Sequence, residues 1–285
     1  MNFLSKSSIL IFFLSATVFM ACEPSDQVLE NNPCDFSESL EGYDLVWEDE
    51  FDGSIDESSW SFNIGDGCDR GICGWGNNEL QYYTDRAANA RTDDGKLIIR
   101  ALAENTPFQG YDYTSARMVT KNKVDIRYGR IDIHAKLPKG QGIWPALWML
   151  STEEKFGIWP RSGEIDIMEL IGNRPSEIFG TVHWGLDFWR FKSSYYELEG
   201  EDFSEDFHTF SLLWREDCMR FMVDGKIYGN AITPSVTLPS NYPFNEDFHL
   251  IFNIAVGGNL PGNPDANTVF PQEMQVEYVK VYSEK

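Results

Sequence analysis

Residues 130–137 alternate strictly between apolar and polar side chains, a pattern typical of a strand with one buried face. The apolar positions are Ile131, Ile133, Ala135 and Leu137. Further short segments of strand type lie at 96–103, 220–223, 249–255 and 276–282. Asp-Gly at 224–225, between the apolar segments 221–223 and 226–228, predicts a hairpin, and Asp-Gly at 94–95 and Gly-Gly at 257–258 indicate other turns. Because no long amphipathic helix pattern and no internal repeat accompanies them, the sequence predicts an all-β sandwich.

The length and charge of the chain restrict its domain count and its partners. Its 285 residues suffice for a short leader and one all-β domain. It carries 45 acidic and 23 basic residues, a formal net charge of −22. Such a surface repels phosphate backbones, so we expect no nucleic-acid partner. Aromatic residues make up 14% of the chain, and their flat rings suit either a β core or a sugar-binding surface.

Residues 1–22 have the pattern of an export signal. Lys6 precedes an apolar run from Ile9 to Met20, which is too short for a membrane span and fits a signal-peptide core. The run ends in Phe-Met-Ala-Cys, which resembles a bacterial lipobox, so we expect lipidation at Cys22. An acylated Cys22 would anchor the chain to a membrane without spanning it. We therefore expect an exported lipoprotein at a bacterial outer membrane or cell surface, with plain secretion as the alternative.

The segment after the leader differs in composition from the rest of the chain. Residues 23–40 are polar and acidic and include Pro24 and Pro33, which favours a flexible tether. Residues 41–285 would then form the folded domain, which we expect to be monomeric.

Four cysteines besides Cys22 belong to this exported chain, and four cysteines allow three pairings. Cys68 and Cys73 bracket a glycine-containing loop and are the favoured pair, which leaves Cys34 and Cys218 to pair by elimination. Free, partly buried thiols are the alternative. No Cys/His spacing resembles a zinc site.

The segment 163–170, Gly-Glu-Ile-Asp-Ile-Met-Glu-Leu, carries the most chemical information. Glu164 and Asp166 share one face of a strand, but a regular strand would turn Glu169 to the opposite face. A β-bulge at Ile167-Met168 would bring Glu169 back to the first face, and bulges occur next to active sites. We therefore expect three carboxyl groups to point into one site.

Carboxyl groups this close have unequal protonation states, because like charges raise the pKa of at least one of them. One carboxyl can then donate a proton to a leaving oxygen while another attacks as an anion. With the bulge, the Cα atoms of Glu164 and Glu169 lie ~13 Å apart. Their long side chains can reach the ~5–5.5 Å separation of a retaining glycosidase, although a solvated acidic strand would show similar alternation.

These residues resemble glycoside hydrolase family 16, and within it the bacterial laminarinase-like endo-β-1,3-glucanases, over roughly residues 43–285. The family pattern E-x-D-x-x-E matches Glu164, Asp166 and Glu169. Other segments also resemble the family: Trp144–Met149, Gly76–Tyr83, Gly180–Trp184, Phe207–Phe210 and Phe252–Asn259. The resemblance implies a β-jelly roll of two bent antiparallel sheets with a concave cleft.

The resemblance also implies roles for individual residues. Glu164 would be the nucleophile, Glu169 the general acid/base, and Asp166 the residue that tunes their protonation. The expected substrate-binding residues are Trp144, Trp148, Trp159, His183, Trp184, Asn78 and Arg117. Trp144 and Trp148 share one strand face, so either could instead belong to the core. The reaction needs no cofactor, and a structural calcium would be bound by Glu50, Gly95 and Glu277, where the family usually has Asp.

The expected function is retaining, endo-acting hydrolysis of β-1,3-glucan or mixed-linkage β-glucan. One alternative is the same chemistry on agar, carrageenan or xyloglucan, which the loops at 104–113, 185–206 and 234–247 would decide. The other alternative is a glucan-binding lipoprotein without catalysis, which the presence of all three acids disfavours.

Overall fold

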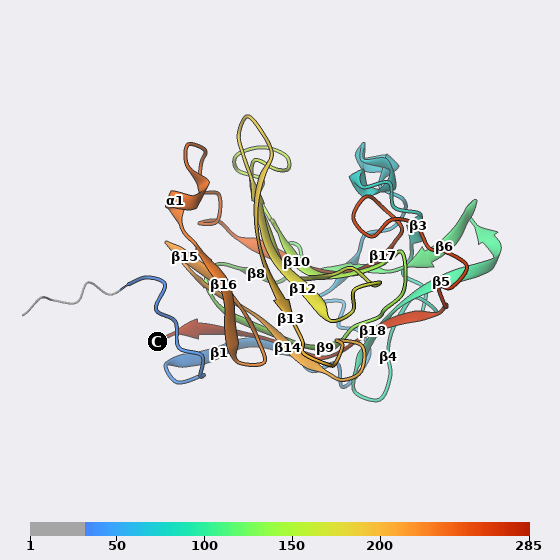
Figure 1. The fold of residues 1–285 in the computed structure, drawn as a ribbon, viewed down its shortest axis with the longest axis horizontal. Coiled ribbons are helices and arrows are strands. Elements are labelled where there is room, and N and C mark those ends of the chain that lie inside the picture. Colours follow the sequence, from blue (N-terminus) through green and yellow to red (C-terminus); the bar gives the residue numbers. More distant parts are fainter. Residues whose placement is uncertain (1–31) are drawn as a thin grey trace, which may run out of the picture. The chain divides into compact units, whose positions relative to one another are not determined.

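Two sheets packed face to face form the fold of this protein (Figure 1). The computed structural model describes residues 32–285, and residues 33–285 form one compact unit. The predicted signal peptide, with Cys22, lies outside the described residues. Nearly all strand pairs are antiparallel, as the sequence predicts.

The 10-stranded sheet has eight strands in one path: β16 (Lys226–Ile232), β15 (Cys218–Val223), β14 (His208–Arg215), β9 (Gly129–Lys136), β18 (Gln272–Glu284), β5 (Leu97–Phe108), β6 (Tyr111–Ser115) and β3 (Gln81–Tyr83). Off this path, β1 (Tyr43–Asp49) pairs with β18, and β4 (Ala90–Thr92) pairs with β5.

The 8-stranded sheet has the order β13 (Arg190–Glu197), β12 (Glu177–Trp184), β11 (Glu164–Leu170), β10 (Ile143–Ser151), β17 (Phe248–Val256), β7 (Arg117–Val119) and β2 (Ser61–Phe62). Its remaining strand, β8 (Asp125–Ile126), pairs with β17. The helical elements are short: η1 (Cys68–Arg70), η2 (Cys73–Gly76) and α1 (Pro234–Thr237). Within residues 32–285, no helix is long and apolar enough to cross a membrane.

The alternation at residues 130–137 places β9 in the centre of its sheet. The apolar side chains of Ile131, Ile133 and Ala135 on β9, and of Leu137 directly after it, are at most 2% exposed and pack in the core between the sheets. The predicted hairpin is also present, because Asp224 and Gly225 connect β15 to β16 with positive φ angles of 49° and 76°. Two consecutive positive φ values suit the two-residue turns that match strand twist.

The 8-stranded sheet buries one face against the core and turns the other away from it. On β10 and β11, residues such as Leu147, Met149 and Ile165 are fully buried. The alternate positions of β10, β11 and β12 form the opposite face, called the site face below: Trp144, Trp148, Glu164, Asp166, Glu169 and His183. On the upper side of Figure 1, the β12–β13 loop (yellow) and the segment with η1 and η2 (cyan) rise on opposite sides of β10 and β17.

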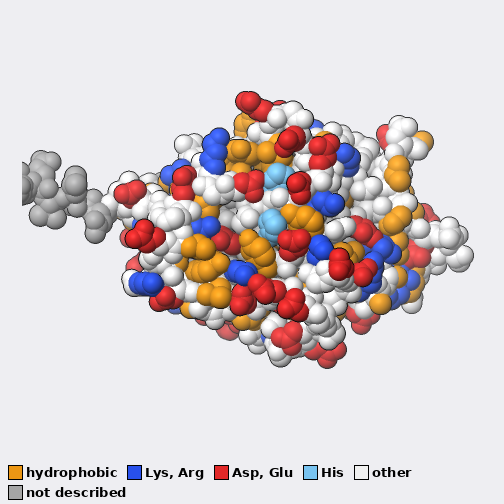
Figure 2. Space-filling view, turned by 90° about the horizontal axis from the view of Figure 1, so that it is seen from below, with side chains coloured by type: hydrophobic (Ala, Val, Ile, Leu, Met, Phe, Trp, Pro, Cys, Tyr) orange, Lys and Arg blue, Asp and Glu red, His pale blue; other side chains and the backbone are white. Residues whose placement is uncertain are grey.

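The far side of the protein has a different character. Figure 2 views it from below, on the side where Figure 1 labels β1, β14 and β9 of the 10-stranded sheet. Acidic side chains are spread over this side, between basic and apolar ones. The acidic side chains are therefore not confined to the site face.

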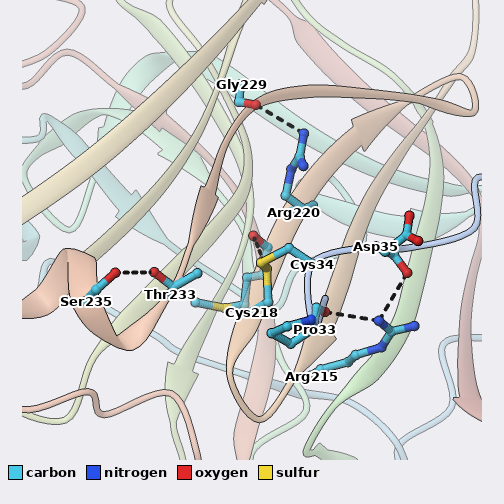
Figure 3. Close-up of a disulfide and its surroundings, with 10 residues drawn as sticks. Pro33, Cys34, Asp35, Arg215, Cys218, Arg220, Gly229, Thr233 and Ser235 are labelled. Atoms are coloured by element: carbon cyan, nitrogen blue, oxygen red, sulfur yellow. Dashed lines mark hydrogen bonds between the residues drawn. A yellow bond between two sulfur atoms is a disulfide. The ribbon is translucent and has the colours of Figure 1, made fainter. Parts of the chain in front are cut away.

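A disulfide between Cys34 and Cys218 attaches the N-terminal segment to β15 (Figure 3). Arg215 donates hydrogen bonds to the carbonyl oxygens of Pro33 and Asp35, and its guanidinium lies 4.3 Å from the ring centre of Phe36. The predicted tether of residues 23–40 is therefore wrong for residues 33–36, which are held by these contacts. Proline and acidic residues indicated flexibility, but the Cys34–Cys218 disulfide outweighs this local composition.

The second disulfide joins Cys68 to Cys73, so the structure has both the favoured pairing and the one expected by elimination. It closes a short loop that carries Arg70 at the end of η1. The two bridges differ greatly in the sequence they enclose, with separations of 184 and 5 residues.

We expect the long-range disulfide to contribute more to stability than the short one. In the chain-entropy account a disulfide stabilises by restricting the unfolded chain, and the effect grows with the enclosed loop. Replacing Cys34 and Cys218 by Ala should lower the free energy of unfolding, measured with urea, by about 2–4 kcal/mol. The matched control, Cys68→Ala with Cys73→Ala, should lose clearly less. Equal losses from the two pairs would contradict this explanation.

Candidate active site

Strand β11 places three carboxyl groups on the site face by means of a bulge. Asp166 pairs with Trp148 on β10, whereas Glu169 pairs with Ala146, so the register shifts by one residue between them. The same shift appears against β12. Ile167 and Met168 are both buried in the core. The predicted bulge at Ile167-Met168 is therefore confirmed, and it returns Glu169 to the face of Glu164 and Asp166.

Burial and mutual repulsion shift the protonation of these acids. Burial, reinforced by the charge of Asp166, raises the pKa of Glu164 to about 8. Burial is also the main reason that the pKa of Asp166 and that of Glu169 are raised, and the charge of Glu169 adds to the effect on Asp166. Near neutral pH the three groups therefore do not all carry a charge, and the site holds protons that it can donate.

His183 on β12 is the partner of the acids at the centre of the site. Its Nε2 lies 3.1 Å from Asp166 Oδ2 and 3.6 Å from Glu164 Oε1. Its other nitrogen, Nδ1, accepts a hydrogen bond of 2.9 Å from the indole N–H of Trp189. Because Nδ1 is an acceptor, the proton of the neutral ring lies on Nε2, where it can be donated to Asp166.

The hydrogen bond from Trp189 to His183 also decides whether this cluster suits a metal ion. Glu164, Asp166 and His183 each offer an atom within 4.8 Å of the others, a spacing that a metal site could use. A histidine nitrogen must be free of its proton to coordinate a metal. Since Trp189 fixes the proton of His183 on the nitrogen facing the acids, the arrangement favours proton transfer over metal binding.

Two tryptophans of β10 border the acids, as predicted. The indole N–H of Trp144 donates to Glu169 Oε1 at 3.0 Å, and that of Trp148 donates to Asn253 Oδ1 at 2.7 Å. Both side chains are only partly buried, so part of each ring remains exposed on the site face. Trp144 thus holds the carboxyl group of Glu169 and also offers a ring surface to a ligand.

Arg117, on β7, lies behind Trp148. Its guanidinium is 4.7 Å from the ring centre of Trp148 and 4.3 Å from that of Trp75. Asn253 continues the network, because its amide donates to Tyr83, whose hydroxyl donates to Glu79 at 3.3 Å. Burial raises the pKa of Glu79 as it does those of the acids on β11.

Aromatic rings extend the site towards the edge strand β13. Trp159 is 49% exposed, and its ring centre lies 6.0 Å from that of Trp189. Trp189 stacks on Phe191 at 5.5 Å, and both rings are more than half exposed. Exposed aromatic faces next to the acids can stack on the apolar faces of sugar rings.

Trp184 does not lie with these residues, which corrects its predicted role in binding. It is 3% exposed and packs in the core, where its indole N–H donates to the carbonyl oxygen of Thr237. Strand alternation is the reason, because neighbours in a strand face opposite sides and His183 occupies the site face. Asn78 is exposed and donates to Asn259 Oδ1 at 2.8 Å.

The residues of the predicted calcium site lie outside the site face. Glu50 accepts a hydrogen bond from Lys280 at 2.7 Å, and Glu277 pairs with His134 at 2.9 Å. Gly95 lies in the turn between β4 and β5. Because Lys280 and His134 engage the two carboxylates, these residues do not fit a calcium site as folded, and we assign no metal to them.

Four contributors were missed from the sequence: Glu79, Tyr83, Asn253 and Trp189. Three of them lie in segments that resembled the family, Gly76–Tyr83 and Phe252–Asn259, so strand alternation within those segments was a usable signal. Trp189 lies just before β13, in a loop whose shape no local pattern predicts.

Comparison with known proteins agrees with this geometry. The model of the family described as "Glycosyl hydrolases family 16" matches residues 72–280 of this chain. The chain is 40% identical over 267 residues to a beta-glucanase of Rhodothermus marinus, with 87% of this chain and 88% of that protein covered. It is 41% identical over 265 residues to glucan endo-1,3-beta-glucosidase A1 of Niallia circulans, with 87% of this chain covered; it spans only 39% of that protein's length.

Solved structures give the same result. The laminarinase catalytic domain from Thermotoga maritima is 46% identical and superimposes with a TM-score of 0.80, covering 86% of this chain and 100% of that one. The endo-beta-1,3-glucanase from Pyrococcus furiosus has a TM-score of 0.79 at 40% identity, covering 85% of this chain and 95% of that one. Since the family match spans most of the sequence and includes the bulged strand, the chain belongs to glycosyl hydrolases family 16.

Proposed function

We propose that this protein is a retaining, endo-acting hydrolase of β-1,3-glucan that also accepts mixed-linkage β-glucan. The observation that carries the proposal is the bulged strand β11, which holds Glu164, Asp166 and Glu169 on one face with raised pKa values. The names of several relatives, among them an endo-1,3-beta-glucosidase and laminarinases, support the β-1,3-glucan linkage.

The reaction would be a double displacement. Glu164, in its ionised form, attacks the anomeric carbon while protonated Glu169 donates its proton to the leaving oxygen. Glu169, now an anion, takes a proton from water, and the water releases the sugar from Glu164 with net retention. The hydrogen bond from Trp144 orients Glu169 in both steps. This family's reaction uses no cofactor.

His183 and Asp166 would adjust the charge of the nucleophile. The Nε2–H of His183 faces both Asp166 and Glu164, so it stabilises whichever carboxylate is ionised. Asp166 raises the pKa of Glu164 by its charge, and a shared proton between these groups can move as Glu164 gains or loses its bond to the sugar.

We extend the proposal to the location of the protein, which would be exported and anchored through Cys22. The leader pattern of residues 1–22 supports this, and the two disulfides fit an oxidising compartment outside the cytoplasm. We do not extend it to a structural calcium, because Lys280 and His134 already engage the expected carboxylates.

A panel of polysaccharides tests the substrate class. We expect rapid release of oligosaccharides from laminarin, slower release from lichenan and none from agarose, with the β-anomer appearing first by NMR because the configuration is retained. Inactivity on laminarin combined with activity on another polysaccharide would overturn the linkage. Binding without hydrolysis on every substrate would indicate a glucan-binding protein.

Azide rescue tests the roles of the two glutamates. On an aryl β-laminaribioside with a good leaving group, Glu164→Ala and Glu169→Ala should each lose at least about 100-fold in kcat. The first variant lacks the nucleophile, and the second lacks the base that activates water for release of the sugar from Glu164. Azide should restore turnover in both, giving an α-glycosyl azide with Glu164→Ala and a β-glycosyl azide with Glu169→Ala. Glu197→Ala, an exposed position on β13, serves as the control and should behave like the wild type. Products of the opposite configuration would exchange the two roles.

The pH profile tests the electrostatic role of Asp166. Because its negative charge raises the pKa of Glu164, Asp166→Asn should let Glu164 ionise at lower pH. The acidic limb of kcat/KM should therefore move to lower pH, although kcat itself falls. Asp206→Asn, at an exposed position, should leave the profile in place. A shift of the acidic limb to higher pH would contradict this account.

A further inference from the structure

A hollow of about 210 Å³ lies on the site face beside the catalytic acids. Leu150 is opposite Glu164 across the β10–β11 pair, and His249 is opposite Leu150 across the β10–β17 pair. The hollow therefore begins one strand away from Glu164. Its polar lining, called the basic hollow below, consists of Asn63, Arg70, Arg117, Lys121, Glu154 and His249.

The charge of this hollow is opposite to that of the whole chain. Three cations line it against one carboxylate, Glu154, in a protein with a formal net charge of −22. Within residues 32–285, Arg70 and Lys121 form no ion pair. An unneutralised cluster of cations is unfavourable unless something compensates for the repulsion, and an anion would do so.

Arg117 is the buried member of the cluster. The residue is 8% exposed, and its Nε has no hydrogen-bond partner within the described chain. Glu79 and Glu164 act on it at longer range, but burial still lowers its pKa. A buried guanidinium with an unused N–H can donate to an oxyanion that enters the hollow.

His249 supplies a hydrogen-bond acceptor in the same wall. The hydroxyl of Thr152 donates to Asp125 Oδ1 at 2.8 Å, so its oxygen is free to accept from Nδ1–H of His249 at 3.3 Å. Burial and the charges of Lys121 and Arg117 lower the pKa of His249 to about 3, which keeps the ring neutral. Its Nε2 is then an acceptor suited to a sugar hydroxyl.

The backbone of Arg70 is restrained before any ligand arrives, while its side chain is exposed. It lies in the loop closed by Cys68 and Cys73, and its guanidinium is 5.6 Å from the ring centre of Trp75. Trp75 is itself buried and contacts Arg117. A cation on a covalently closed loop beside an aromatic ring loses less freedom on binding an anion than one on an open loop.

We propose that the basic hollow binds an acidic substituent, a carboxylate or a sulfate ester, on a saccharide that occupies the site face. The chemistry is that of oxyanion recognition, in which guanidinium groups donate paired hydrogen bonds. Its volume is below the ~300–1,000 Å³ of pockets that enclose a whole ligand, which suits a group projecting from a longer chain. The inference depends on the proposed function in one respect, which is that a glycan lies along the site face.

This binding position would widen the range of glycans that the protein recognises. An acidic chain is repelled by the surface as a whole, but the basic hollow offers it one favourable contact near the reacting bond. Glucans carrying scattered acidic groups would then bind in a preferred register, with the acidic residue next to Arg117.

Calorimetry on three matched trisaccharides tests the proposal: laminaritriose, the same sugar with one glucuronate, and the same sugar with one sulfate ester. The protein is the full chain carrying Glu169→Gln, so that the sugars are not consumed. We expect at least one acidic sugar to bind five-fold or more tightly than the neutral one at low salt, and the ratio to approach one at 0.5 M salt. The two acidic sugars show which oxyanion the hollow prefers.

Variants that each remove one positive charge show whether the preference for acidic sugars comes from the basic hollow. Lys121→Gln and Arg70→Gln should each reduce the acidic-to-neutral affinity ratio about two- to five-fold, as expected for partly exposed charges. Lys96→Gln removes the same charge from the β4–β5 turn and should leave the ratio unchanged. A ratio of one in the parent protein, or equal effects of Lys96→Gln and Lys121→Gln, would overturn the proposal. Because the readout is binding, it remains decisive even if the wild type fails to cleave laminarin.

Discussion

The bulge in β11 is the constraint on which the site depends. Ile167 and Met168 both enter the core, so the alternation of the strand restarts and Glu169 emerges beside Asp166. In a regular strand Glu169 would point into the apolar core, where an unpaired carboxylate is strongly unfavourable. The packing of two apolar side chains thus determines the direction of a reactive one.

The acids are held in a position that is unfavourable for their charged forms. Burial raises the pKa of each of them, and no cation forms a short contact with all three within the described chain. The hydrogen bond from Trp144 and the proximity of the His183 ring compensate in part, and the core on the other side of the sheet keeps the strand in place. Active sites commonly give up stability in this way, because the same burial that destabilises a charge adjusts its pKa for catalysis.

Net charge is a poor guide to what the site face can bind. The chain is strongly acidic, and acidic side chains are spread over the side seen in Figure 2. Next to Glu164, however, Arg70, Arg117 and Lys121 line one hollow. Composition averages over the whole surface, whereas a ligand responds to the few groups within a Debye length of it.

The sequence alone determined the sandwich of antiparallel sheets, the hairpin at Asp224-Gly225, the bulge and the Cys68–Cys73 disulfide, because each leaves a local mark in spacing or turn residues. The Cys34–Cys218 pairing followed from the other pair by elimination. The composition of the sequence favoured a flexible tether at residues 23–40, although the pairing of Cys34 with Cys218 fastens residues 33–36 to β15. Only the tertiary structure placed Trp184 in the core, brought Trp189 to His183 and gathered the cations of the basic hollow. Those arrangements come from β7, β10, β17 and the loops meeting in space, and no local pattern records which residues of distant segments will be neighbours.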